Sequence, residues 1–167
     1  MDELFDFSVD KDTNTIYITR EFAADLDLVW DAFTKAEILD QWMAPKPWRL
    51  KTKEMDFREG GRWLYAMIST ENVARYSLAE FVKIEPKSSF TSRNSFSDEN
   101  GNAINAVFSL TTHNFKAGAG KTTLQMVKIM PSLAVLEQFI AGGMYREGVA
   151  MGMRNLDELL LTLVSNK

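Results

Sequence analysis

The C-terminal part of the chain carries a long helical pattern, which constrains the fold more than any other stretch. Apolar side chains spaced three and four residues apart predict one helix from about Leu133 to Val164. Its apolar face carries Val149, Met153, Leu156, Leu160 and Leu163. At about 1.5 Å per residue this helix would be roughly 45 Å long, about the width of a small domain.

Glycines weaken the first half of this predicted helix. They are Gly142, Gly143, Gly148 and Gly152. Each lowers helix stability by roughly 1 kcal/mol relative to alanine. We therefore expect tertiary packing to hold the helix, with a sheet approaching it closely.

Most of the remaining chain alternates with the two-residue period of β-strands. The predicted strands are Leu4–Val9, Thr15–Phe22, Arg49–Asp56, Arg62–Ser69, Tyr76–Glu85, Ser89–Phe96, Ile104–Asn114 and Thr122–Ile129. A helix capped by Asp25 or Asp27 and running to about Lys35, and a second near Glu37–Trp42, follow the first main strand. The order of strand, helix pair, five or six strands and long helix predicts an α+β fold, in which one antiparallel sheet curls against the final helix.

Composition limits the classes of protein to which the chain can belong. The 167 residues predict a single domain, with 46% hydrophobic and 25% charged residues, as in soluble globular proteins. A net charge of −4 argues against a nucleic-acid partner, and the lack of cysteine excludes disulfides and thiol chemistry. With no secretion signal and no apolar segment of about 20 residues, the sequence predicts a cytoplasmic protein without a membrane span.

Sequences that resemble phosphate or metal sites fail at key positions. Gly120-Lys121-Thr122 lacks the earlier glycine of a phosphate loop, because Phe115 stands there, and a strand pattern rather than a helix follows it. The acidic turns after Asp10 and Asp98 lack the central glycine of a calcium loop. We expect neither a metal nor a cofactor.

Aromatic and methionine residues give the strongest signal for a binding site. Trp63, Tyr65 and Met67 alternate on one strand face, and the chain has nine methionines, which suit an adaptable apolar interior. Core packing explains most of these residues, but a strongly curved sheet around one helix can also leave a ligand cavity. The candidate lining residues are Trp42, Trp63, Tyr65, Met67, Phe108, Met126, Met144 and Val149.

Candidate catalytic residues are few and weak. His113 is the only histidine, and the sequence favours an exposed position for it near a strand end over a catalytic base at a pocket mouth. Glu80 and Arg93 lie on predicted strands, where exposure is commoner than the inward position that would shift their pKa values.

Several segments appear in the order typical of a known family. They are the strand Ile16–Phe22, the helix Leu26–Phe33, Gln41-Trp42-Met43-Ala44-Pro45, Asp56-Phe57-Arg58-Glu59-Gly60-Gly61-Arg62-Trp63, and Glu147-Gly148-Val149 to Leu160. Over about residues 14–164 the chain resembles the activator of the ninety-kilodalton heat-shock chaperone ATPase homologue family, in the START/Bet v 1-like (SRPBCC) superfamily. This resemblance implies a helix-grip fold with an interior cavity, and many members bind apolar small molecules.

Two positions depart from the family pattern. Trp42 matches the first residue of a paired aromatic motif near the cavity mouth, but Met43 stands where the second aromatic is usual. Val149 stands where tryptophan is common after the helix glycine. Both residues are smaller or softer than the family's, so the resemblance implies a larger or reshaped cavity.

Three functions follow as hypotheses. The first is a binding protein for a small apolar or aromatic molecule held between the sheet and the C-terminal helix, and the sequence favours it over an enzyme. The second is a cyclase- or hydrolase-like enzyme that uses a polar group in the same cavity, for which His113, Glu80, Arg93 and Tyr65 are the candidates. The third, a chaperone partner, ranks lowest, because the sequence contains no match to the activators' additional chaperone-binding domain. A homodimer is compatible with all three.

Overall fold

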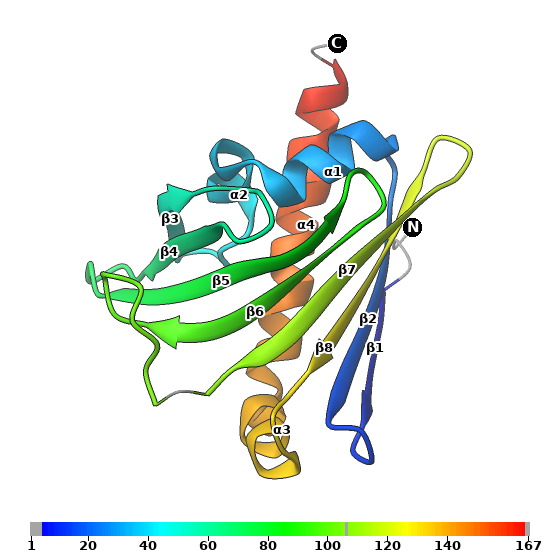
Figure 1. Ribbon diagram of the computed structural model, residues 1–167. Helices are drawn as coiled ribbons and strands as arrows, with labels where there is room; N and C mark the ends of the chain where they lie inside the picture. The colour runs from blue at the N-terminus through cyan, green and yellow to red at the C-terminus, as the bar shows by residue number, and fades with distance from the viewer. Residues whose placement is uncertain (1–4, 106, 166–167) are drawn as a thin grey trace.

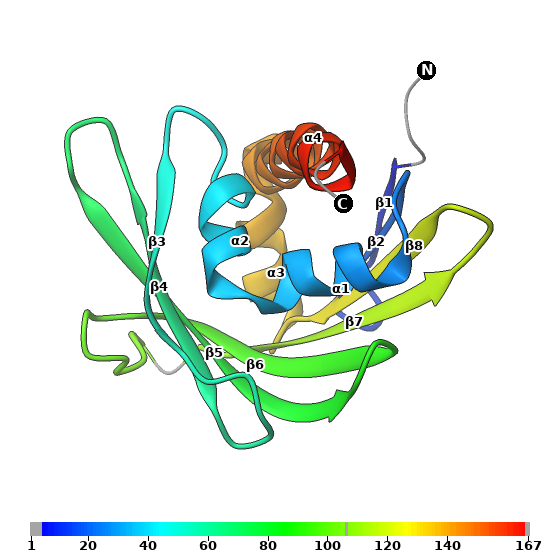
Figure 2. The same cartoon turned by 90° about the horizontal axis from the view of Figure 1, so that it is seen from above.

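The computed structural model describes residues 5–105 and 107–165, which form a curved eight-stranded sheet with helices on its concave side (Figure 1, Figure 2). The strands are β1 (Phe5–Asp10), β2 (Thr15–Phe22), β3 (Arg49–Met55), β4 (Arg62–Ile68), β5 (Ala74–Glu85), β6 (Ser89–Ser97), β7 (Ser109–Ala117) and β8 (Thr122–Ile129). The helices are α1 (Leu26–Thr34), α2 (Ala36–Trp42), α3 (Leu133–Ile140), the short 3₁₀ turn η1 (Ala141–Gly143) and α4 (Met144–Ser165). This is the predicted α+β helix-grip architecture.

The sheet is antiparallel throughout and stays open. Its strand order is β1-β2-β8-β7-β6-β5-β4-β3, so β1 and β3 form the two edges. β-bulges at Thr52/Glu54 and at Phe81/Lys83 interrupt the register of β3 and β5, and such bulges increase local bending. Figure 2 shows the result, a sheet bent around α1 and α2, with α4 lying across its open side.

Alternating side chains divide the sheet into a concave and a convex face. In β2, Ile16, Ile18 and Phe22 are almost fully buried, whereas the intervening Tyr17 is 36% exposed. The predicted bounds of β2 and β8 are confirmed, and β1 begins at Phe5; the predicted Leu4 lies outside the described residues. The two-residue period therefore predicts most of the sheet, although β4 buries residues of both faces, as Trp63 and Leu64 show.

The helix pair after β2 closes one end of the concave face. Asp25 caps α1, since its side chain accepts a hydrogen bond from the Leu28 backbone N–H at 3.3 Å. The Trp42 indole N–H of α2 donates to the Ala32 carbonyl oxygen at 2.9 Å, which ties α2 to α1. Both helices bury their apolar sides against the strands.

The prediction of a single C-terminal helix is wrong. The helical pattern is broken at Gly142 and Gly143, whose φ angles of 74° and 72° lie in the left-handed region that glycine tolerates. The chain therefore forms the short α3, capped by Ser132, and then the separate 22-residue α4. None of the described helices is long and apolar enough to span a membrane.

The glycines inside α4 also act differently from the prediction. Gly152 lies against the end of α2, where a Cβ atom would stand 3.0 Å from the Met43 carbonyl oxygen. One turn further on, the Asn155 side-chain amide donates to the carbonyl oxygens of Trp42 and Ala44, each at 3.2 Å. The close approach that Gly152 permits is therefore to the α2–β3 connection and not to the sheet.

The start of β7 differs from the prediction as well. The expected strand Ile104–Asn114 begins only at Ser109, because Asn105 has a φ of 60° and cannot continue an extended strand. The connection before it starts in a turn around Asp98, whose carboxylate accepts hydrogen bonds from the backbone N–H groups of Asn100 and Asn102. Alternation among the apolar residues of this connection therefore does not mark a strand.

Candidate functional site

Aromatic rings pack closely on the concave face beneath α1. The Trp30 ring of α1 lies edge-on to Phe57, Phe90 and Phe115, with centroid distances of 5.9, 5.9 and 5.1 Å. Phe33 adds a further edge-on contact with Trp42 at 4.9 Å. Edge-to-face rings at these distances are typical of a well-packed core.

Beneath the first half of α4, the concave face carries partly buried side chains in place of closely packed aromatic rings. Seven inward residues lie there and form what we name the inner cluster: Tyr65, Met67, His113, Met126, Lys128, Tyr145 and Val149. They come from β4, β7, β8 and α4, and all seven are only partly buried although their strand positions or helix face point inward. These seven side chains are therefore more exposed to solvent than Trp30, Phe33, Phe90 and Phe115 of the aromatic core.

Lys128 is the cation of the inner cluster. Its Nζ donates to Thr111 Oγ1 at 3.2 Å and lies 5.5 Å from the centroid of the Phe139 ring. No carboxylate of the described residues forms a salt bridge with it. Burial lowers the pKa of Lys128 to about 8, because an ammonium loses hydration in an apolar setting.

His113 faces the interior, so the expectation of an exposed strand-end position is wrong. Its ring stacks on Phe90 with a centroid distance of 4.4 Å and an interplanar angle of 14°. Burial, and secondarily the charge of Lys128, lowers the pKa of His113 to about 3. The imidazole is thus neutral at pH 7, and its buried Nδ1 has no hydrogen-bond partner within residues 5–105 and 107–165.

Two tyrosines complete the polar side of the inner cluster. The Tyr65 ring stacks on Trp63 with a centroid distance of 3.9 Å, and its hydroxyl is hydrogen-bonded to Ser77. Tyr145 packs against Phe139 with a centroid distance of 4.4 Å. Burial raises the pKa values of both phenols, and the proximity of Tyr65 raises that of Tyr145 further. Both hydroxyls therefore stay protonated and can donate hydrogen bonds.

The structure brings together most of the predicted lining residues. Trp63, Tyr65, Met67, Met126 and Val149 lie in or beside the inner cluster, whereas Trp42 is buried against Phe33 of the aromatic core. Two predicted residues lie elsewhere. Met144 is 82% exposed, and Phe108 precedes β7, where its ring lies 3.5 Å from the Arg93 guanidinium carbon.

The weak catalytic candidates Glu80 and Arg93 also lie outside the concave face. They are neighbours across β5 and β6, form a 3.7 Å ion pair, and are half exposed. They alternate with the buried Phe81 and Ser92, which point inward, so both charges lie on the convex face. Neither side chain can reach a ligand held beneath α4.

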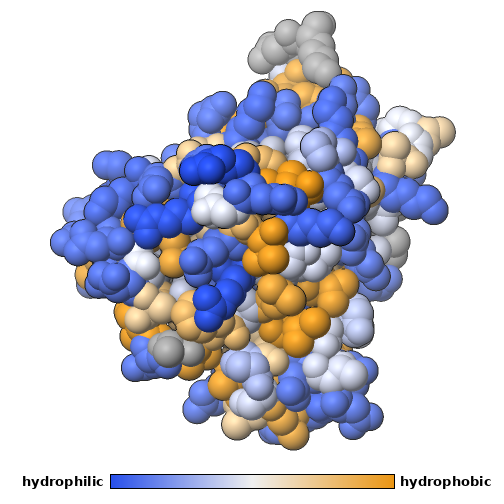
Figure 3. Space-filling view, viewed as in Figure 1, coloured by the Kyte–Doolittle hydropathy of each residue, from blue (hydrophilic) through white to orange (hydrophobic). Residues whose placement is uncertain are grey.

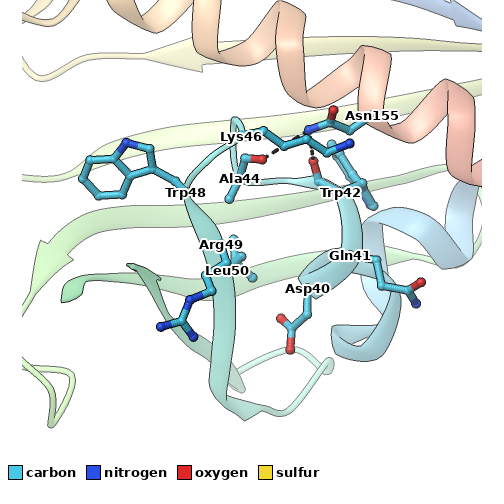
Figure 4. Close-up of a pocket in the computed structure, with 9 residues that line it drawn as sticks. All are labelled: Asp40, Gln41, Trp42, Ala44, Lys46, Trp48, Arg49, Leu50 and Asn155. Carbon is cyan, nitrogen blue, oxygen red and sulfur yellow. Dashed lines mark hydrogen bonds between the residues drawn. The ribbon is translucent and has the colours of Figure 1, made fainter. Parts of the chain in front are cut away.

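A separate small pocket opens beside α2 (Figure 4). Its volume is about 120 Å³, and its lining is Asp40, Gln41, Trp42, Ala44, Lys46, Trp48, Arg49, Leu50 and Asn155. Trp42 is the one predicted residue in this set. The pocket is smaller than the roughly 300–1,000 Å³ typical of small-molecule sites, so it is a poor fit for a metabolite.

Hydrogen bonds connect this pocket to the wall of the inner cluster. The Trp63 indole N–H donates to Thr52 Oγ1 at 3.0 Å, and Thr52 Oγ1 donates to Asp40 Oδ1 at 2.6 Å. The Thr52 backbone N–H also donates to the Asp40 carboxylate at 3.1 Å. Asp40 is therefore engaged in holding β3 and Trp63 in place.

Apolar side chains also gather near the middle of the outer face that Figure 3 presents. Leu110 and Ile129 are register partners on the convex side and are 39% and 44% exposed. They lie on the side of the sheet opposite the inner cluster, so they are not part of that site.

Neither Lys128 nor Tyr145 was predicted from the sequence as a residue of the site. The signal for Lys128 was present, because it alternates with Leu124 and Met126 and so shares their inward face. The signal for Tyr145 was its spacing, because it lies one helical turn before Val149 and so shares the same face of the helix. Among the described residues, no group of three or more His, Cys, Asp or Glu side chains could hold a metal ion.

Comparisons with known proteins agree with this fold. A search of curated proteins found no significant match. Among solved structures, protein Ms6760 from Mycobacterium smegmatis has a TM-score of 0.86 at 25% identity, covering 97% of this chain and 99% of its own. A protein from Staphylococcus epidermidis has a TM-score of 0.82 at 26% identity, covering 93% and 94%.

A more distant structure extends the same fold. CalU16 from Micromonospora echinospora has a TM-score of 0.62 at 17% identity, covering 96% of this chain and 87% of its own. The family model for Activator of Hsp90 ATPase homolog 1-like protein matches residues 23–161, which is most of the chain. The protein therefore belongs to the Activator of Hsp90 ATPase homolog 1-like family, whose fold is that of a ligand-binding superfamily.

Proposed function

We propose that the protein binds a small apolar or aromatic molecule between the concave face of the sheet and α4. The observation that carries this proposal is the incomplete burial of the inner cluster, although its residues lie on the helix-covered side of the sheet. A filled core would bury these positions as fully as it buries Ile16, Ile18 and Leu124.

The chemistry of the inner cluster supports the same function. Met67 and Met126 supply flexible, polarisable walls that adapt to a ligand's shape. Val149 leaves more room on α4 than the tryptophan that the family resemblance implies at this position. Tyr65 and Tyr145 supply a small number of oriented hydrogen-bond donors, which is the usual composition of such sites.

The properties of His113 favour binding over acid–base catalysis. A general base works best with a pKa near the operating pH, whereas the pKa of His113 is lowered to about 3. Glu80 and Arg93, the other enzyme candidates, lie on the convex face. Of the four residues proposed for an enzyme, only Tyr65 then remains as a candidate for acid–base catalysis.

The test combines ligand discovery with a variant that fills the proposed space. Native mass spectrometry of protein purified from its own host, and a thermal-shift screen of apolar and aromatic compounds, would identify binders. A ligand at 100 times its Kd stabilises the fold by about 2.7 kcal/mol, which raises the unfolding temperature by several degrees. The Val149→Trp variant should lose this shift, because the added indole occupies the space beneath α4.

Leu161→Trp is the matched control, since Leu161 is on the same helix but 70% exposed. The control should keep the wild-type thermal shift. Equal ligand responses in both variants, or a screen and a native spectrum without any bound molecule, would contradict the proposal.

A further inference from the structure

The charges on the strands are divided between the two faces of the sheet. Register and alternation place every carboxylate of the eight described strands on the convex face: Asp6, Asp10, Glu21, Glu54, Glu80 and Glu85. The ionisable nitrogen bases on the concave side are Arg20, Arg75, His113 and Lys128. The concave face is thus basic even though the whole chain has a net charge of −4.

Of Arg20, Arg75 and Lys128, only Arg20 forms an ion pair with a carboxylate of the described residues. The Arg20 guanidinium forms an ion pair with the Asp157 carboxylate of α4. Arg75 lies near the β3 edge of the sheet, where its guanidinium carbon is 6.0 Å from the centroid of the Trp48 ring. Lys128 lies deeper, between β2 and β7, and its contacts are the Thr111 hydroxyl and the Phe139 ring.

The helices that cover Lys128 supply no described carboxylate partner either. Glu137 on α3 and Glu147 on α4 are both exposed, and Glu158 pairs with Lys46. A partly desolvated ammonium without a counterion is costly, and an anion placed beside it would offset that cost. Burial accounts for the lowered pKa of Lys128, because it removes hydration from the ammonium.

We infer that the ligand held beneath α4 carries a carboxylate, which pairs with the Lys128 ammonium while the ligand's apolar body lies against Met126 and Val149. This inference rests on the proposed function and narrows it to apolar acids. The Tyr145 ring packs on Phe139, the same ring that the Lys128 ammonium approaches, and its protonated hydroxyl can donate a further hydrogen bond to a carboxylate oxygen. A neutral ligand of the same shape would leave the ammonium unpaired.

The test uses two matched pairs of probes: 2-naphthoate with 2-naphthylmethanol, and decanoate with decanol. In each pair the apolar body is the same and only the head group differs. Calorimetric titration of the wild-type protein at pH 7 should give at least tenfold tighter binding of the acid than of the alcohol. The Lys128→Met variant should lose that preference, while its affinity for the alcohol stays unchanged or improves.

Lys116→Met is the control, because Lys116 is exposed on the outer face of β7 and should keep the wild-type preference. Lys128→Arg retains the positive charge and should also keep the preference for the acid over the alcohol. This variant tests the role of the charge if Lys128→Met folds poorly. A direct readout is the Lys128 pKa measured by NMR: the acid should raise it above the free value of about 8, and the alcohol should not.

The outcomes separate this inference from the proposed function. If acid and alcohol bind equally well to the wild type, or if Lys128→Met weakens both equally, the carboxylate inference is overturned and the apolar site stands. If none of the four probes binds, both are overturned.

Discussion

Acid should destabilise this protein through its only histidine. The His113 pKa is lowered to about 3 in the fold, against about 6.5 in an unfolded chain. Below pH 6.5 the unfolded state therefore binds a proton that the native state does not, so stability falls as pH falls towards 3. Each pH unit within that window costs about 1.4 kcal/mol, which gives roughly 2 kcal/mol between pH 6.5 and pH 5.

The assay is urea unfolding of the wild type and of His113→Phe at pH 7 and at pH 5. Phenylalanine keeps an aromatic ring against Phe90 but cannot bind a proton. The carboxylates titrate in both proteins, so their contribution cancels in the difference. The wild type should lose about 2 kcal/mol more than the variant on acidification.

An equal loss of stability in the two proteins would refute this reasoning. It would mean that His113 is protonated within the fold at pH 5, and hence that the interior near Lys128 tolerates a second positive charge. An NMR titration of the single imidazole would show the same result directly, with a midpoint near 6.5 in place of about 3.

Two further predictions concern the packing of α4. Gly148→Ala should stabilise the fold by up to about 1 kcal/mol, because its Cβ would meet no atom closer than 3.9 Å. Gly152→Ala should destabilise the fold, because its Cβ would press on the Met43 carbonyl oxygen at 3.0 Å. Thermal unfolding of both variants gives the sign of each change, and equal shifts in their unfolding temperatures would contradict the close contact at Gly152. Asp157→Ala should lower the free energy of unfolding by about 2 kcal/mol, because it leaves the Arg20 side chain, which is 5% exposed, without a counterion. Urea unfolding measures this change, and a value below about 0.5 kcal/mol would show that the ion pair does not stabilise the fold.

Alternation predicted the sheet well because strands such as β2 have one buried and one more exposed face. The pattern of Trp63, Tyr65 and Met67 predicted that these side chains share one face of the sheet, and the register places them, with Met126, on the concave face. The rule failed at Ile104 to Phe108, where apolar residues alternate within a connection. Pattern alone could not reveal the left-handed conformation of Asn105 that ends the strand there.

The helical period failed in a comparable way at the C-terminus. Apolar spacing continues smoothly from α3 into α4, so it gave no sign of the break at Gly142 and Gly143. The adjacent glycines were the available signal, but two glycines can equally lie within a helix that packs closely on a neighbour. Met144 was misplaced for the same reason, since it begins a new helix and faces solvent.

The polar residues of the site were harder to predict than its apolar wall. A charged residue on a strand is usually exposed, and this general tendency concealed the inward position of Lys128. His113 was misjudged on the same grounds. The register across β2, β8 and β7 shows that both side chains face the interior, together with Ile16 and Met126.

The most direct measurement of the central claim uses the methionine methyl groups as reporters of where a ligand lies. With ¹³C-labelled methionine methyls, saturating 2-naphthoate should shift the Met67 and Met126 signals through the ring current of the probe. Met144, which is 82% exposed, should stay unchanged. Unperturbed Met67 and Met126 signals under conditions where calorimetry detects binding, or a shift confined to Met144, would contradict a ligand site beneath α4.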